Sequence, residues 1–224
     1  AGPASYGLAC VRTLAKDDRR HYARYPWVSG QRYLDSSAAS RLGVGQFHGI
    51  EIDEWPAQIA QVAMWLTDHL ANLDLEEQFG GHQTRLPLVD TAHITIVNAL
   101  RIDWDSLLPD SEFSHILGNP PFLGSNVQSD EQKDDARFIW DKTRGAGSLD
   151  YVACWFRKAA DYIDGRDTRV AFVSTNSISQ GEQPAVLWGY LATKDCHIDF
   201  AHRSFAWSNE AKGVAAVHCV IVGF

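Results

Sequence analysis

The sequence has few cysteines, no long apolar run and no excess of positive charge, and each absence narrows the possible functions. Its 224 residues include four cysteines that stand far apart and form no Cys-x-x-Cys pair. We therefore expect reduced thiols in apolar surroundings, not a disulfide framework or a zinc site. No run of about 18 apolar residues marks a membrane span, and no signal-peptide pattern opens the chain. A cytoplasmic protein is expected, with no membrane as a partner.

The balance of charge argues against one kind of nucleic-acid surface. The formal net charge is −8, with 20 basic and 28 acidic side chains, whereas a large phosphate-binding groove needs clustered Lys and Arg. If the protein acts on DNA, we expect other segments to supply most of the contacts to the phosphate backbone. The nine histidines form no His-x-x-x-His or His-Glu-x-x-His pattern, so no metal site is expected from them.

Short apolar strands alternate with amphipathic helices along the chain. A long helical pattern follows Asp53, with Ile59, Val62, Leu66 and Leu70 on one apolar face. Strands are predicted over 46–53, 93–100, 113–118, 168–174, 197–201 and 215–224, and shorter helices over 130–140, 151–162 and 182–191. This alternation predicts a doubly wound α/β fold, a mostly parallel sheet with helices on both faces. The length suits one domain, 1–224.

The most distinctive stretch is Phe113-Ser114-His115-Ile116-Leu117-Gly118-Asn119-Pro120-Pro121-Phe122. It is an apolar strand that must stop at two prolines, because proline can neither continue the ladder nor be preceded readily by a helix. An amide, a free carbonyl and an aromatic ring are thus held at a strand's carboxyl end, where open α/β sheets bind ligands. The corner suits a planar amide or amine, although turn chemistry alone more often means a simple turn with a buried ring.

Polar side chains also close other predicted elements. Glu51 ends a strand just before the long helix, where a carboxylate can bind ribose hydroxyls or can simply be favoured by the helix dipole. Asp53 is a weaker candidate for the ribose contact. Asn98 ends the next strand and could be an ordinary turn residue. Asp150 precedes a predicted helix and is a candidate N-cap that accepts backbone amides.

Taken together, these blocks resemble the amino-methyltransferases that use S-adenosylmethionine and modify DNA. Besides the Asn-Pro-Pro-Phe corner, four stretches agree in order and spacing: Gly49-Ile50-Glu51-Ile52-Asp53, Asn98-Ala99-Leu100, Gly147-Ser148-Leu149-Asp150-Tyr151-Val152, and Phe172-Val173-Ser174-Thr175-Asn176-Ser177-Ile178. The block from Ala201 to Ala211 resembles the MmeI-like branch in particular. Its members are large bacterial restriction-modification proteins in which endonuclease, methyltransferase and target-recognition regions share one polypeptide.

The resemblance covers nearly the whole chain and implies a class I, Rossmann-like methyltransferase fold. It implies adenine-N6 methylation of DNA by a type II restriction enzyme, with S-adenosylmethionine as cofactor and no metal needed. The implied partners are double-stranded DNA with a flipped adenine and the recognition and nuclease regions of the larger protein. The implied compartment is the bacterial cytoplasm.

The same resemblance implies three sets of site residues. Catalysis would fall to Asn119, Pro120, Pro121 and Phe122. The cofactor would be bound by Glu51, Ile52, Asn98, Ala99 and Asn119. The target base would be stacked or positioned by Phe122, Asp150, Tyr151, Phe205 and Trp207.

In one respect the sequence departs from the family. The glycine-rich loop, an Asp-Pro-Ala-Cys-Gly-Ser-Gly type of sequence, is not present in its usual form; either Gly2 to Gly7 is an altered remnant or the loop precedes Ala1. We expect a methyltransferase core cut from a larger protein. Two alternatives stay open: a methyltransferase acting on a protein glutamine, whose amide is also planar, and a structural or DNA-binding module that cannot bind the cofactor.

Overall fold

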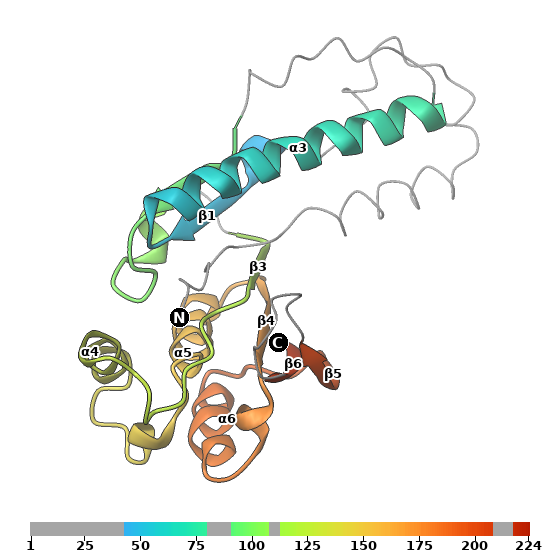
Figure 1. Cartoon of the computed structure of the whole chain (residues 1–224). Coiled ribbons are helices and arrows are strands. Elements are labelled where there is room, and N and C mark those ends of the chain that lie inside the picture. The colour runs from blue at the N-terminus through green and yellow to red at the C-terminus, as the bar shows by residue number, and fades with distance from the viewer. Residues whose placement is uncertain (1–42, 80–90, 108–112, 208–216) are drawn as a thin grey trace. The chain divides into compact units, whose positions relative to one another are not determined.

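The computed structural model describes residues 43–79, 91–107, 113–207 and 217–224. Its described part divides into two compact units, one ending at Val97 and the other running from Asn98 to Phe224. In chain order the elements are β1 (His48–Glu51), α3 (Glu54–Phe79), β2 (His93–Ile96), β3 (His115–Gly118), α4 (Asp130–Ile139), α5 (Ala153–Ile163), β4 (Arg169–Thr175), α6 (Gln183–Thr193), β5 (Phe200–Trp207) and β6 (Val217–Gly223), as Figure 1 shows. The single-domain assignment stays a prediction.

The first unit is a β-α-β arrangement. Strands β1 and β2 pair in parallel, with His48 opposite His93 and Glu51 opposite Ile96, and α3 connects them. Helix α3 begins at Glu54, an acid in its first turn, where the helix dipole favours negative charge. No helix in the described residues is long and apolar enough to cross a bilayer.

The periodicity of α3 correctly predicts a helix but not a buried face. Ile59, Val62, Leu66 and Leu70 are between 52% and 58% exposed in this unit. A two-stranded sheet is too short to cover them, since strands of four residues span about 13 Å, whereas a helix of 26 residues extends about 39 Å. The helix also runs to Phe79, although the sequence from Glu76 onward reads as a polar loop.

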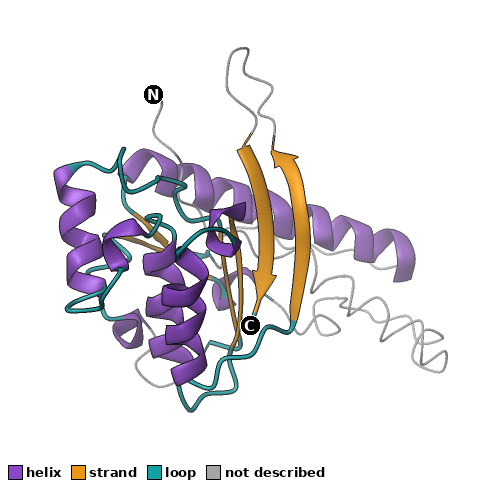
Figure 2. Ribbon diagram, turned by 90° about the horizontal axis from the view of Figure 1, so that it is seen from below, coloured by secondary structure: helices purple, strands orange, loops and turns teal. Residues whose placement is uncertain are grey.

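The second unit contains a four-stranded sheet in the order β3-β4-β6-β5. Strand β3 pairs with β4 in parallel, whereas β6 is antiparallel to both β4 and β5, as the opposed arrows in Figure 2 show for β5 and β6. The α/β prediction is therefore confirmed. The pairs β1–β2 and β3–β4 are parallel, whereas the pairs β4–β6 and β5–β6 are antiparallel.

A cluster of aromatic rings forms the core of this unit. The ring of Phe156 on α5 is 5.3 Å from that of Phe172 on β4, 5.7 Å from that of Trp188 on α6 and 5.6 Å from that of Phe224 (centroid distances). Edge-to-face and stacked rings at such distances add to the stabilisation from burial. The contacts hold α5 and α6 against one face of the sheet.

Three of the cysteines lie in described residues, and all three are free thiols. Cys154 and Cys219 are buried, as expected from their apolar surroundings, whereas Cys196 is half-buried; Cys10 lies outside the described residues. Burial raises the pKa of the Cys154 thiol to about 12.

We expect Cys154 to resist iodoacetamide at pH 8, because its thiol is 1% exposed and alkylation requires an accessible thiolate. Cys196 should be labelled first among the described cysteines, since it is the most accessible of them. Mass spectrometry of peptides from the native protein measures this order. Labelling of Cys154 as fast as Cys196 would contradict the buried position of α5.

Candidate active site

The register of the second sheet brings several predicted site residues to one edge. Strands β3, β4 and β5 run in the same direction, so their carboxyl ends lie together. Asn119 follows β3 directly, and Thr175 ends β4 opposite Cys219, which in turn lies opposite Phe205 of β5. The corner and the block after Ala201 are therefore parts of the same edge, although about 80 residues separate them in sequence.

The Asn-Pro-Pro-Phe corner contains an unusual acceptor. The side-chain oxygen Oδ1 of Asn119 is buried, yet no hydrogen bond reaches it within the described part of the chain. Pro120 and Pro121 are buried, and Phe122 is half-buried. A buried polar atom without a partner costs about 1–3 kcal/mol, so native proteins keep few of them. The corner presents an acceptor that a ligand with an N–H group can satisfy.

The loop that leaves the corner is held by two hydrogen bonds. The carbonyl of Leu123 accepts from the backbone N–H of Tyr151 at 2.8 Å. It also accepts from Nε2 of Gln128 at 3.3 Å, and the same amide donates to the carbonyl of Leu149. The backbone next to Phe122 is thus joined to the segment before α5.

The carboxylate of Asp150 links that segment by hydrogen bonds to the residues at the carboxyl end of β4. Its Oδ2 accepts from the hydroxyl of Thr175 at 3.0 Å and from that of Ser177. Its Oδ1 accepts from Nε2 of Gln183 at 3.2 Å. The N-cap prediction for Asp150 is therefore wrong: α5 begins at Ala153, Val152 is its N-cap residue, and no side-chain bond caps it. Three side-chain donors replace the expected backbone amides.

Asn98 and Tyr151 both bond to a second carboxylate, that of Asp135 on α4. Nδ2 of Asn98 and the hydroxyl of Tyr151 both donate to Oδ2 of Asp135 at 2.8 Å, and Nε of Arg101 donates to Oδ1 at 2.5 Å. Oδ1 of Asn98 accepts from the N–H of Leu100 at 2.9 Å. Burial alone would raise the pKa of Asp135, but the hydrogen bonds from Asn98, Arg101 and Tyr151 hold that pKa below its ordinary value.

The other expected cofactor residues differ in burial. Glu51 ends β1, is 3% exposed, and accepts the N–H of Ile52 at Oε1 (2.9 Å). Ile52, the next residue, is exposed. Both belong to the first unit, whereas Ala99 belongs to the second, where its carbonyl accepts from Nε1 of Trp104.

A bulge in β5 sets the face on which Phe205 lies. From His202 to Phe205 the strand has one residue more than β6 has between Ile221 and Cys219. Such an extra residue moves every following side chain to the opposite face. Phe205 thereby lies opposite Cys219 where Ser204 would otherwise lie. Trp207 ends the strand opposite Val217.

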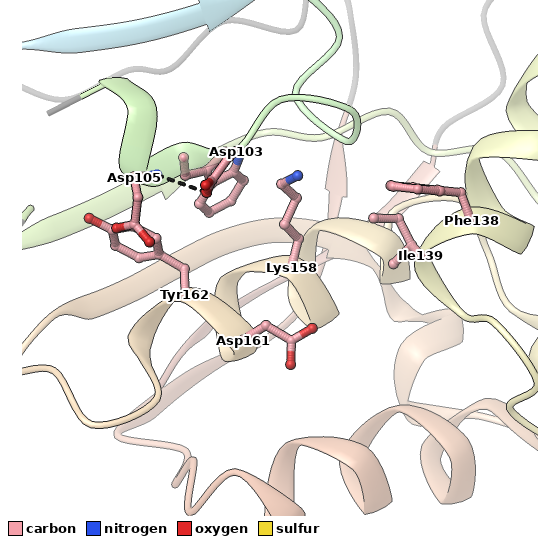
Figure 3. A pocket seen from close by; sticks show the side chains of 8 residues that line it. Asp103, Asp105, Phe138, Ile139, Lys158, Asp161 and Tyr162 are labelled. Carbon is pink, nitrogen blue, oxygen red and sulfur yellow. Dashed lines mark hydrogen bonds between the residues drawn. The ribbon is translucent and has the colours of Figure 1, made fainter. Parts of the chain in front are cut away.

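A separate hollow of about 320 Å³ lies on the second unit, and none of the predicted site residues lines it. Figure 3 shows the Lys158 side chain of α5 extending between Asp103 and Phe138. The ammonium donates to the carbonyls of Leu100 (3.1 Å) and Ile102 (2.5 Å). Desolvation by burial lowers the pKa of Lys158. Because its ammonium already bonds the turn after Asn98, Lys158 fastens that turn to α5.

Sequence reasoning missed Asp135 and the partners of Asp150. The charged segment 124–147 reads as a solvated surface, which is right for Asp134 but wrong for Asp135 and Gln128, both buried. The helix itself is well signalled, because Ser129 and Gln132 form a capping box. In the described residues no group of three or more His, Cys, Asp or Glu side chains could hold a metal.

Comparison with known proteins agrees with this geometry. A family model described as "MmeI, DNA-methyltransferase domain" matches residues 15–224. The chain is 41% identical over 184 residues to DNA methyltransferase A of Bacillus subtilis (strain 168), covering 81% of this chain and 21% of that protein. A solved structure of the type IIL restriction-modification enzyme MmeI in complex with DNA matches with a TM-score of 0.83 and 47% identity, over 94% of this chain and 29% of that one. The chain thus spans about a fifth to a third of these relatives.

Proposed function

The chain belongs to the MmeI DNA-methyltransferase family, and from this premise we propose that it transfers a methyl group from S-adenosylmethionine to the exocyclic amino group of an adenine in DNA. It would act as the modification core of a fused restriction-modification enzyme, with recognition and nuclease regions elsewhere in the full-length protein. The relative solved in complex with DNA supports DNA as the substrate, and we propose that this DNA is double-stranded.

One observation carries the proposal: the buried, unpartnered Oδ1 of Asn119 at the carboxyl end of β3. An adenine amino group has two N–H donors and would give this oxygen the hydrogen bond it lacks. Its nitrogen is a poor nucleophile because its lone pair is delocalised into the ring. Acceptors at Asn119 and Pro120 that take both hydrogens would favour a geometry in which the lone pair is localised and aimed at the methyl group.

The remaining corner residues would orient the base. Pro120 and Pro121 fix the backbone that carries the acceptors, and Phe122 is accessible enough to stack on a flipped base, a contact of about 1–3 kcal/mol. Phe205 and Trp207 stand in the strand that ends at the same edge. Asp150 and Tyr151 would act through position, since both hold the segment bonded to the corner loop.

S-adenosylmethionine supplies an electrophilic methyl group on a sulfonium centre. We propose that Glu51 accepts hydrogen bonds from its ribose hydroxyls, that Ile52 and Ala99 supply apolar contacts to it, and that Asn98 bonds the edge of its adenine ring. Asn119 would complete this set at the methyl end. The chain's residues therefore suit the cofactor, and the transfer itself depends on in-line placement more than on acid or base strength.

The two alternatives are less well supported. Both relatives and the family model are named for DNA methylation or restriction, which favours a DNA base over a protein glutamine. A module without catalysis would have no use for the side-chain oxygen of Asn119 that lacks a partner in the described residues.

The direct test is methylation of double-stranded DNA by the full-length protein with tritiated S-adenosylmethionine, followed by nucleoside analysis. We expect the label in N6-methyladenine. Label in cytosine, or in protein glutamine and not in DNA, would overturn the assignment of substrate. Absence of cofactor binding in the full-length protein would remove the enzymatic proposal altogether.

Replacing Glu51 by glutamine should weaken S-adenosylmethionine binding by about 10- to 100-fold, because hydrogen bonds to a charged acceptor contribute about 1.5–3 kcal/mol. Calorimetric titration of the full-length protein measures the dissociation constant. Asp53→Asn is the matched control: Asp53 is exposed two positions away and should change affinity less than about twofold. A larger loss for Asp53→Asn than for Glu51→Gln would transfer the ribose contact to Asp53.

A further inference from the structure

Asp135 is the point where two parts of the proposed site are joined. It lies on α4, is 6% exposed, and its Oδ2 accepts from both the Asn98 amide and the Tyr151 hydroxyl. Asn98 belongs to the turn that follows β2, whereas Tyr151 lies two residues before the start of α5. One carboxylate oxygen therefore links the expected cofactor contact to the expected target side.

The first consequence is a fixed orientation of the Asn98 amide. An ionised carboxylate only accepts hydrogen bonds, so the amide nitrogen must face Asp135 and the amide oxygen must face the N–H of Leu100, as observed. One N–H and one oxygen lone pair of the Asn98 amide remain available to a ligand. A donor beside an acceptor is the pattern with which Asn and Gln recognise the edge of adenine. A reversed amide would present these groups in the wrong order.

The second consequence reaches the Asn-Pro-Pro-Phe corner. The hydroxyl of Tyr151 is bonded to Asp135, and its backbone N–H is bonded to the carbonyl of Leu123, the residue after Phe122. The Tyr151 ring is also packed edge-on against Trp155, with centroids 5.1 Å apart. Asp135 thus links the turn at Asn98, through Tyr151, to the loop that follows Phe122.

We propose that Asp135 is a positioning residue for methyl transfer, which orients the Asn98 amide toward the adenine ring of the cofactor and holds Tyr151 against the corner loop. This inference rests on the proposed function. Arg101 balances the buried charge through its bond to Oδ1 of Asp135, and its other nitrogen pairs with exposed Asp134. Removing the carboxylate should therefore disturb ligand binding through Asn98.

The test is Asp135→Asn in the full-length protein, with S-adenosylmethionine affinity measured by calorimetry. An amide at this position has one acceptor oxygen instead of two, so it cannot accept from Asn98 and from Arg101 together. We expect about tenfold weaker binding, in the range by which residues that orient a ligand-binding group commonly act. A change of less than twofold would overturn the inference.

A double-mutant cycle separates positioning from general stability. If Asp135 acts through Asn98, then Asp135→Asn should cost less than about twofold in affinity when Asn98→Ala is already present. An equal loss in both backgrounds would overturn the proposal, since a merely structural effect does not depend on Asn98. Asp134→Asn is the matched control: it removes the same charge from the neighbouring, 66% exposed side chain and should leave affinity within twofold.

A second variant keeps the inference testable if Asp135→Asn does not fold by circular dichroism. Tyr151→Phe removes one donor to Asp135 and keeps the ring. It should weaken binding about threefold, again only when Asn98 is present, because a single hydrogen bond to Asp135 is lost. An unchanged affinity of Tyr151→Phe for S-adenosylmethionine would overturn the positioning role of Asp135. If the wild-type protein binds no cofactor, the proposed function and this inference fall together; if it binds and methylates independently of Asp135, only this inference falls.

Discussion

Asn119→Ala is expected to lower methyl transfer to DNA by at least about 10²–10³-fold, the usual loss when a preorganised polar contact to the reacting group is removed. Cofactor affinity should change less than about threefold, because the principal proposed contact of the Asn119 oxygen is with the target amine. The expected loss of methyl transfer rests on the buried side-chain oxygen of Asn119, which has no hydrogen-bond partner among the described residues. Single-turnover methylation by the full-length protein, with calorimetry for the cofactor, measures both quantities.

Two companion variants make this result specific. Asn126→Ala changes the same residue type at an exposed position of the following loop and should leave the methylation rate within about twofold. Asn119→Asp retains an acceptor oxygen and should retain more activity than Asn119→Ala. Methylation at the wild-type rate by Asn119→Ala would refute the chemistry proposed for the corner, even if the protein is a methyltransferase.

Phe156→Ala should lower the free energy of unfolding by about 3–5 kcal/mol, the cost of removing a large ring from a packed core. Phe156 is 0% exposed and contacts rings from β4, α6 and the chain's last residue. Because domains are stable by only about 5–15 kcal/mol, this loss should leave the second unit close to unfolding at 37 °C. Urea unfolding followed by circular dichroism provides the measurement.

Phe138→Ala is the control for that experiment. It makes the same chemical change on α4, where the side chain is 56% exposed and carries the guanidinium of Arg101 at 4.6 Å above its ring. An exposed cation–π contact contributes about 0.5–1 kcal/mol, so the expected loss is no larger than that. Equal losses for the two variants would contradict the aromatic core around Phe156.

Local patterns were sufficient to predict most of the elements. The strand before Asn119 and the stop at Pro120 depend on neighbouring residues alone, and the structure ends β3 at Gly118. The helix after Ser129 was equally predictable, because a capping box involves residues only three apart. The extent of α3 was underestimated because the polar residues from Glu76 onward are as compatible with helix as with loop.

Features that depend on distant partners could not be predicted in the same way. Asp150 reads as an N-cap in sequence, yet its carboxylate is taken by Thr175, Ser177 and Gln183, which are 25 or more residues away. Asp135 is one acid among several in a polar segment, and nothing local distinguishes it from exposed Asp134. Its burial depends on the donors that Asn98, Arg101 and Tyr151 bring to it.

The sequence by itself determined the order of strands and helices, the rigid corner at Asn119 and the family resemblance, since each is written in contiguous residues. Tertiary structure alone decided which acid is buried, which carboxylate orients Asn98 and on which face of β5 Phe205 lies. The physical reason is that a charged side chain is buried only where enough donors converge to replace water. Such convergence is a property of the folded sheet and its turns, not of any single stretch of chain.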